Sequence, residues 1–324
     1  MYQMMSLPLY SGTLGEYNSW RDLGQELERL GCDGIEGVWG GEDLPKDLPA
    51  ELILGYHLIF YPDWLDFWRG DRNALERKFG SMESWRSFYG GKEGRETLLR
   101  LYREDLERAL LWGAKYVVFH VSDVSIEEGY TYQWEHKNEE IIAAAAEALN
   151  LLLGERNFDF ALLLENQWWP GFTFTEPALT ARLLDAVAYP NKGIMLDIGH
   201  LMNTNLSIST QAEGADYLHE VLDVHGSLCT YIRGIHLHQS VSGAYVKANT
   251  GKLPGDLPAD YLERFAYSYR HILRIDTHRP WTHPSIRSVV ERIRPEYLVH
   301  ELSAAGRKER DQAISLQRRA LGWK

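Results

Sequence analysis

The sequence predicts a single-domain α/β fold, a (β/α)8 barrel in which eight parallel strands form a closed sheet covered by helices. Two observations lead to this prediction. Short apolar strands alternate with helical stretches along the chain, which is typical of parallel α/β sheets. Nearly all of the strands are mostly apolar, as expected where both faces of a sheet are buried. The length of 324 residues suits one barrel, residues 1–324, without a domain boundary.

The alternation is clearest where a helix, a glycine and a strand follow one another. In residues 15–30 apolar side chains recur at helical spacing, and Gly31 ends the helix before the strand at 32–36. Residues 106–112, Gly113 and 115–120 repeat this order. We expect strands at 7–10, 32–36, 53–57, 115–120, 161–165, 194–196, 231–236 and 297–301. Further helices are expected at 138–153, 177–188, 211–224 and 308–321.

Two long segments interrupt the alternation, and each follows a predicted strand. Residues 61–92 carry several Trp, Phe and Tyr between charged residues, and residues 239–275 follow the seventh strand. Loops after the strands of such a barrel lie at its C-terminal face, where active sites are found. We therefore expect both insertions at the mouth of the barrel.

Composition argues against several classes of protein. The formal net charge of −12 and the lack of a basic run argue against a nucleic-acid-binding surface, although bound cations would offset carboxylates locally. Cys32 and Cys229 match no metal or redox spacing. The first residues have no signal-peptide features, and no apolar run reaches membrane-spanning length. A cytoplasmic protein without membrane contact is expected.

Titratable side chains stand at the C-terminal ends of the third to eighth predicted strands, shortly after the sixth, and before the helix that leads into the eighth. The candidates are His57, His120, Glu165, Asp197, His200, His236, Asp276, His278 and Glu301. Any one of them alone would usually be a capping or hydrogen-bonded loop residue. Four carboxylates around one mouth would repel each other unless they are paired or bound to cations. The set therefore predicts a metal centre, and its many imidazoles favour zinc or a similar ion.

The order of these motifs resembles the xylose isomerase-like TIM-barrel superfamily and, within it, the endonuclease IV family (AP endonuclease family 2). The segments that carry the resemblance are Val118-Phe-His120, Leu164-Glu-Asn166, Leu196-Asp-Ile-Gly-His200, Gly234-Ile-His-Leu237, Asp276-Thr-His278 and Glu301. The resemblance implies a cluster of up to three divalent ions. In it, Glu165 would bridge a first ion on His57 and His120 to a second ion. The remaining ligands would be Asp197, His236 and Glu301 for the second ion, and His200, Asp276 and His278 for the third.

The chain departs from this family pattern in several places. The insertion at 239–275 stands where the family has a short loop, and His238-Gln-Ser240 replaces the family's Asp-Ser. The arginine of the family's second-strand loop has no counterpart in residues 37–41. Phe60 and Tyr61 stand where the family places residues that wedge into DNA, but aromatic residues there could also form a wall that stacks on a sugar, or could simply pack, which is the favoured interpretation.

One chemistry that the resemblance implies is hydrolysis of a phosphoester. Ions bridged by Glu165 would activate water for attack on phosphorus, so that Glu165 would be a bridge and not a base. The implied substrate is a small phosphorylated compound or abasic DNA. The acidic charge and the aromatic mouth favour a small substrate.

The alternative chemistry is isomerisation or epimerisation of a sugar or sugar phosphate. One manganese, cobalt or magnesium ion would then be bound by Glu165, Asp197, His236 and Glu301. Glu165 and Glu301 would act as the acid/base pair, and His200 would polarise the carbonyl. The arginine that such epimerases place after the seventh-strand histidine is missing from residues 241–243. A barrel kept only for binding is a third alternative, which the complete ligand set argues against.

Other residues are predicted to contact substrate or to be structural. Trp168, Trp169 and His238 are candidates for binding a polyhydroxy or phosphorylated substrate. The histidines expected to be structural are His136, His219, His225, His271 and His283. His300 should point away from Glu301, because side chains alternate along a strand.

Overall fold

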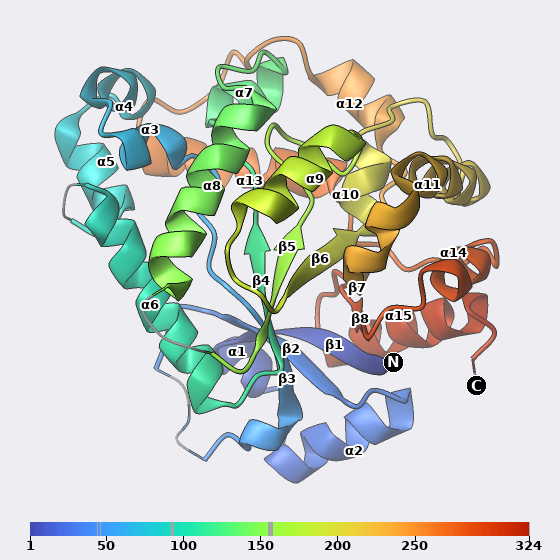
Figure 1. Ribbon diagram of the computed structural model, residues 1–324. Coiled ribbons are helices and arrows are strands. Elements are labelled where there is room, and N and C mark those ends of the chain that lie inside the picture. Colours follow the sequence, from blue (N-terminus) through green and yellow to red (C-terminus); the bar gives the residue numbers. More distant parts are fainter. Residues whose placement is uncertain (44, 46, 92–93, 155–157, 324) are drawn as a thin grey trace.

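The computed structural model describes residues 1–43, 45, 47–91, 94–154 and 158–323, and its eight strands close into one parallel barrel (Figure 1). β1 (Tyr2–Leu9) closes the ring by pairing with β8 (Tyr297–His300). The strands between them are β2 (Gly34–Trp39), β3 (Ile53–His57), β4 (Tyr116–His120), β5 (Ala161–Glu165), β6 (Lys192–Asp197) and β7 (Ile232–Leu237). The predicted (β/α)8 barrel is confirmed.

β1 begins earlier than the predicted strand at 7–10. Residues 2–5 pair with β8, and residues 4–9 pair with β2. Met4 and Met5 are fully buried, although the sequence around them shows no clear strand period. These residues become a strand when the two ends of the chain meet, and a local pattern carries little information about that contact.

Helices cover the outside of the barrel after most strands (Figure 1). α2 (Trp20–Leu30) begins at Ser19, whose side chain accepts a hydrogen bond from the Asp22 N–H, and ends at Gly31 in the left-handed conformation (φ 66°). The other long outer helices are α6 (Arg95–Leu111), α8 (Asn138–Leu153), α9 (Pro177–Ala186), α11 (Gln211–His225), α14 (Ile286–Ile293) and α15 (Arg307–Ala320). The shorter elements are α1 (Ser11–Leu14), η1 (Ala50–Leu52), α7 (Ile126–Thr131), α10 (Ile198–Asn203) and η2 (Gly226–Tyr231).

The two insertions fold into helices at the C-terminal face. The first forms α3 (Leu65–Arg69), α4 (Arg72–Phe79) and α5 (Met82–Phe88), while residue 92, its predicted end, lies outside the described residues. The second forms α12 (Gly243–Asn249) and α13 (Tyr261–Ile275). Phe79 stacks on Tyr261 with ring centroids 3.8 Å apart, so the insertions support each other. Figure 1 shows α4, α7 and α12 above the strand ends.

The interior of the barrel is filled by side chains from alternate positions of the strands. Its core consists of Met4, Tyr116, Val118, Ala161, Leu163, Met195, Tyr297 and Val299. Gly55 leaves room for this packing, since a Cβ there would lie 2.2 Å from the Tyr116 ring. Because side chains alternate with period two, the next inward position on several strands is the strand's last residue. The fold therefore aims several strand ends into the barrel mouth.

The helices of the described residues were also compared with the length of a membrane span. None of them is both long enough and apolar enough to cross a bilayer.

Candidate metal centre

The candidate metal centre lies directly above the interior core. Glu165 follows Leu163 of that core by two residues, so the pleat turns it inward. The last residues of neighbouring strands lie side by side, because His120 pairs with Glu165 and Asp197 pairs with His236. The structure thus brings side chains from separate strands together, as expected from their positions at the strand ends.

His57, His120 and Glu165 form the first group of donor atoms. The Nε2 atoms of His57 and His120 are 3.0 Å apart and lie 3.2 and 3.1 Å from the same oxygen, Glu165 Oε2. His57 Nδ1 donates to the Leu58 carbonyl oxygen at 2.8 Å, which leaves a lone pair on Nε2. Two imidazoles and a carboxylate at this spacing suit zinc or a similar divalent ion.

His236 is the centre of a second group. Its Nδ1 lies 3.1 Å from Glu301 Oε2, 3.5 Å from Glu165 Oε1 and 3.7 Å from Asp197 Oδ2. Glu165 directs Oε1 toward this group and Oε2 toward the first, which is the arrangement of a bridging carboxylate. Glu165, Asp197 and His236 lie close enough to one another to share a single ion, and Glu301 adjoins this group through its contact with His236.

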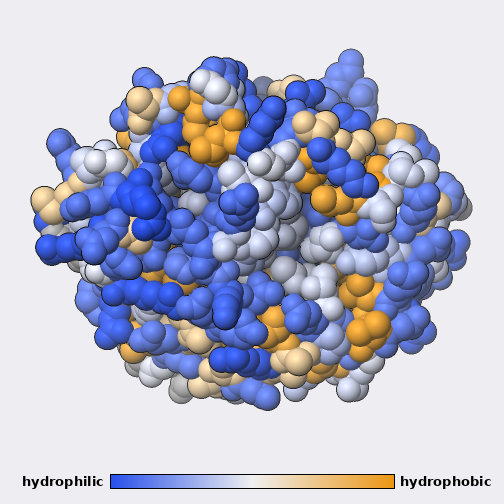
Figure 2. Space-filling view, turned by 90° about the horizontal axis from the view of Figure 1, so that it is seen from above, coloured by the Kyte–Doolittle hydropathy of each residue, from blue (hydrophilic) through white to orange (hydrophobic). Residues whose placement is uncertain are grey.

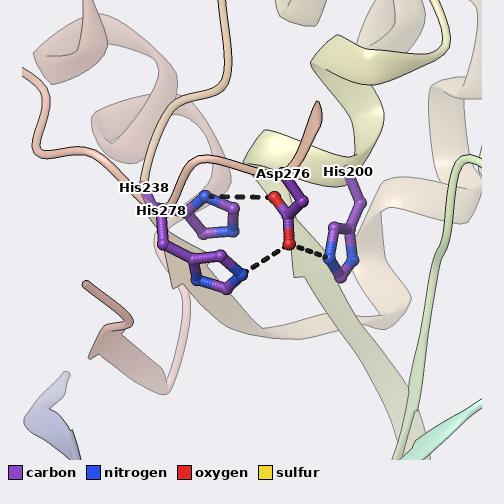
Figure 3. Close-up of side chains that lie close together, drawn as sticks. All are labelled: His200, His238, Asp276 and His278. Atoms are coloured by element: carbon purple, nitrogen blue, oxygen red, sulfur yellow. Dashed lines mark hydrogen bonds and ion pairs between the residues drawn. The ribbon is translucent and has the colours of Figure 1, made fainter. Parts of the chain in front are cut away.

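The third group surrounds Asp276 (Figure 3). Asp276 Oδ2 lies 3.2 Å from His200 Nε2 and in contact with His278 Nε2, while Oδ1 is 3.8 Å from His238 Nδ1. The long insertion before Asp276 therefore does not separate it from the site. His238 was not predicted as a ligand, and it is fully buried within this group.

Glu36 is a buried residue of the site that the sequence analysis did not single out. Its Oε1 lies 2.9 Å from His236 Nε2, and its Oε2 accepts a hydrogen bond of 2.7 Å from the Tyr116 hydroxyl. This contact fixes the His236 ring so that Nδ1 faces the donors above it. The sequence feature that could have identified Glu36 is its position as an acidic residue within an otherwise apolar strand.

Two further polar side chains, also missed, hold the carboxylates in place. The Asn166 side chain accepts from the Asp197 N–H at 2.8 Å and donates to the Asp197 carbonyl at 3.0 Å, which ties β5 to β6. Ser240 Oγ donates to Asp276 Oδ1 at 3.1 Å. These contacts depend on the distance between loops, and the sequence gives no sign of them.

The centre is buried on most sides. The side chains of Glu165 and His236 are at most 1 % exposed, whereas those of His278 and Glu301 are 18 % and 21 % exposed. Burial opposes ionisation of Glu165, but the charges of His120 and His236 hold its pKa well below the usual range. Burial also disfavours the charged form of His236, yet Glu301 and the other carboxylates raise its pKa well above the usual value.

Unpaired buried atoms show that the donor set fits cations. Within the described part of the chain, His236 Nδ1, His238 Nδ1 and Glu301 Oε2 are buried and make no hydrogen bond, although His236 Nδ1 and Glu301 Oε2 lie 3.1 Å apart as an ion pair. Buried polar atoms are rarely left unpaired. All three face the groups of nitrogen and oxygen donors, so divalent ions would satisfy them.

Aromatic side chains stand around the centre. Trp168 and Trp169 pack with apolar residues of the second insertion and are 7 % and 8 % exposed. Phe60 stacks on His120 with ring centroids 4.5 Å apart and is 44 % exposed, whereas Tyr61 turns into the aromatic cluster of the first insertion. Contact of either Trp with a substrate stays a prediction. Figure 2 looks down on this face, with residues of intermediate hydropathy at its centre and hydrophilic ones around them.

Two histidines that were expected to be structural make contacts outside the centre. His136 lies 3.1 Å from Asp66, but Lys78 Nζ already lies 2.7 Å from the same carboxylate and occupies the place of a cation. His300 turns away from the mouth, and its Nδ1 accepts a hydrogen bond of 2.9 Å from Gln317.

Comparison with known proteins identifies the family. The model of the xylose isomerase-like TIM barrel family matches residues 25–280. The chain belongs to the xylose isomerase-like TIM barrel family. No curated protein sequence matches it.

Solved structures share the fold at low identity. Endonuclease IV from Thermus thermophilus gives a TM-score of 0.55 at 17% identity, over 99% of each chain. An L-ribulose 3-epimerase gives 0.54 at 11% identity, over 99% of this chain and 94% of its own. A D-tagatose 3-epimerase-like protein gives 0.51 at 14% identity, over 99% and 97%. The fold is therefore shared with an endonuclease and with epimerases, and fold alone does not decide the reaction.

Proposed function

We propose that this protein is a hydrolase that cleaves a phosphoester with up to three divalent ions, of which zinc fits the imidazole-rich donors best. The observation that carries the proposal is that three donor groups lie side by side and share residues. Glu165 belongs to the first two groups, and Asp197 contacts both His236 and His238. A single-ion enzyme would not need the first and third groups.

In this proposal the carboxylates hold ions and do not act as bases. Glu165 bridges through its two oxygens, and Asp197 and Glu301 complete the central group. Bound divalent ions would polarise the phosphoryl oxygen and lower the pKa of water. His200 is fixed by its Nδ1, 3.0 Å from the Asn166 carbonyl oxygen, so that Nε2 serves the third group.

The proposed substrate is a small phosphorylated compound or an abasic site in DNA. The partly exposed side of the centre, at His278 and Glu301, would admit it. Trp168 and Trp169 would bind its sugar, and Phe60 offers an exposed aromatic face next to the first group. The net charge of −12 favours the small substrate.

A sugar isomerase or epimerase is the second candidate. The observation that favours it is that the central group alone can hold one ion, with Glu165 and Glu301 both near His236 Nδ1. Those two carboxylates would then move a proton between the faces of a carbon atom, and His200 would polarise the carbonyl. Manganese, cobalt or magnesium would suit this chemistry.

Substitution of the first group separates the two candidates. Metal-loaded protein would be assayed on bis(p-nitrophenyl) phosphate, an abasic-site oligonucleotide and a panel of ketoses, with the metal content counted. The proposal expects phosphoester cleavage, about three ions per chain, and a loss of about 100-fold or more in His57→Asn. His283→Asn, at an exposed site, is the matched control. Ketose turnover with one ion and an unaffected His57→Asn variant would instead establish the isomerase.

A further inference from the structure

A pocket lies against the short segment that carries two residues of the third group. Asp276 and His278 belong to that group, whereas Thr277 and Arg279, the alternate residues of the segment, line the pocket. Arg274, in the last turn of α13, lines it as well. The pocket has a volume of about 320 Å³, and small-molecule sites have about 300–1,000 Å³. Two arginines thus share one pocket beside the candidate metal centre.

Neither of these two guanidinium groups is neutralised by a carboxylate. In the part of the chain that the structure describes, the side chains of Arg274 and Arg279 have no ion-pair or hydrogen-bond partner, and no acidic residue lines the pocket. Other exposed arginines behave differently, and Arg292 lies 2.6 Å from Asp223. The chain has 46 acidic residues against 34 Lys and Arg, so carboxylates are plentiful. Positive charge that stays unpaired in such a protein attracts an anion from solution.

The other polar side chains of the pocket already have partners. The Ser242 hydroxyl donates to the Asn203 side chain at 2.9 Å, and the Thr277 hydroxyl donates to the Gln239 carbonyl oxygen at 3.0 Å. The donors left open to a ligand are therefore those of the arginines.

Both arginines are positioned before any ligand binds. The Arg274 guanidinium lies over the Tyr245 ring, 5.0 Å from its centroid, and the Tyr245 hydroxyl is 2.9 Å from His271 Nδ1. The main chain of Arg279 is paired with that of Gln239, with hydrogen bonds of 2.8 and 3.3 Å. A pocket arranged in advance loses less free energy when its ligand binds.

We propose that Arg274 and Arg279 bind a phosphoryl group in this pocket. The planar guanidinium group presents paired N–H donors that match two oxygens of a phosphate. Residues 276–279 lie between the pocket and the third group, so the bound group is not the one that the ions would cleave. It is either a second phosphoryl group of the substrate or free phosphate. The first of these sources rests on the proposed function, whereas binding itself does not.

Calorimetry tests the binding without any assay of activity. The full chain would be dialysed against EDTA, so that no ion competes for phosphate, and titrated with inorganic phosphate. Arg274→Gln and Arg279→Gln should each bind phosphate about 10-fold or more weakly than the wild type. Both side chains are exposed, so both variants should keep the wild-type melting temperature.

Arg270→Gln is the matched control and should bind phosphate like the wild type. Arg270 is also exposed on α13, and its guanidinium lies over a tyrosine ring, 5.2 Å from the Tyr267 centroid, but it does not line the pocket. Equal affinity in the wild type and all three variants, or no binding by the wild type, would overturn the proposal.

A pair of substrates then identifies the source of the phosphoryl group. Metal-loaded protein would be assayed on the p-nitrophenyl ester of thymidine 5′-phosphate, with and without a second phosphate on the 3′-oxygen. If the pocket serves the substrate, the second phosphate should lower KM by about 10-fold in the wild type and in Arg270→Gln, and Arg274→Gln and Arg279→Gln should lose this advantage.

The outcomes separate the pocket from the proposed function. Phosphate binding that is lost in the two pocket variants, without any effect of the second phosphate on KM, would support the pocket with free phosphate as its ligand. If neither ester is cleaved, the proposed function fails and the calorimetry still decides the pocket. Cleavage of both esters, with equal phosphate affinity in every variant, would leave the proposed function standing and overturn the pocket.

Discussion

Glu36 lies on β2 beneath the metal centre, with one carboxylate oxygen 2.9 Å from His236 Nε2. In Glu36→Gln the shape of the side chain is kept but its charge is lost, so His236 becomes a weaker and less firmly oriented ligand. We expect metal retention against a chelator to fall by about 10–100-fold. Glu51→Gln, at an exposed carboxylate, is the control and should retain metal like the wild type. Equal retention in both variants would contradict the role given to Glu36.

His225 makes a prediction about pH that does not involve the metal centre. Burial lowers its pKa, and its neutral ring stacks on Phe174 with centroids 3.9 Å apart and contacts Thr180 Oγ1 at 3.1 Å. Below the unfolded pKa of about 6.5 the unfolded chain binds a proton that the folded chain does not, so folding stability is lost as the pH falls.

The measurement is the urea midpoint at several pH values. Wild type should lose stability between pH 7 and pH 5 more steeply than His225→Gln, by at most about 1.4 kcal/mol per pH unit. His225→Gln will be less stable at neutral pH, and the comparison concerns only the slope. Parallel slopes would show that His225 does not titrate on unfolding.

At the scale of residues, the sequence predicted the nine candidate ligands because each stands at or near a strand end, where the fold itself dictates the destination. Glu36 ends the predicted second strand but was not singled out, whereas Ser240 could not be assigned in this way, since its contact is with another loop. His238 was placed at the mouth but predicted to touch substrate. The structure places it, fully buried, in the third group of donor residues.

Among the elements, α10 shows how two interpretations of one residue can both hold. Asp197 Oδ1 accepts a hydrogen bond of 2.6 Å from the His200 N–H and so caps this helix, while Oδ2 faces His236 and His238. The capping aspartate and the proposed metal ligand are therefore the same residue. The cap fixes the start of the helix and with it the position of His200.

The helices of the first insertion enclose a buried charge cluster around Lys78. Its Nζ lies 3.0 Å from Asp63 and 2.7 Å from Asp66, and each of the three side chains is at most 4 % exposed. Burial raises the pKa of Asp63 to about 8 although the Lys78 ammonium lowers it, so the ionised form of this carboxyl depends on Lys78. The sequence showed the insertion as aromatic and charged, but not that the charges lie inside it.

Lys78→Met should destabilise the protein by about 3–5 kcal/mol, because it leaves buried carboxylates without their counter-charge. Lys247→Met, at an exposed position of α12, is the matched control and should change stability by less than about 0.5 kcal/mol. Urea unfolding followed by circular dichroism measures both. Similar midpoints in the two variants would mean that the Asp63 and Asp66 carboxyls protonate without cost.

For the whole molecule, the barrel could be predicted because strand and helix periods repeat along the chain, and both insertions were expected at the mouth. The sequence does not show how the two ends of the sheet meet to close the barrel. The first residues of β1 and the contact between Phe79 and Tyr261 arise only when distant segments meet. Closure also assembles the metal centre, since its donors come from the ends of β3 to β8 and the loops that follow them.

Removal of metal should therefore lower the stability of the entire barrel. In the proposed centre, ions held by six strand ends would cross-link the sheet, and a ligand that binds only the folded state at about 1,000 times its Kd adds about 4 kcal/mol of stability. Dialysis against EDTA should lower the melting temperature by about 5–10 °C, and added Zn2+ should restore it. Glu301→Gln, which lacks one donor, should show a smaller difference between its loaded and stripped forms. An unchanged melting temperature after metal content has been shown to fall would mean that the bound ions do not stabilise the folded barrel.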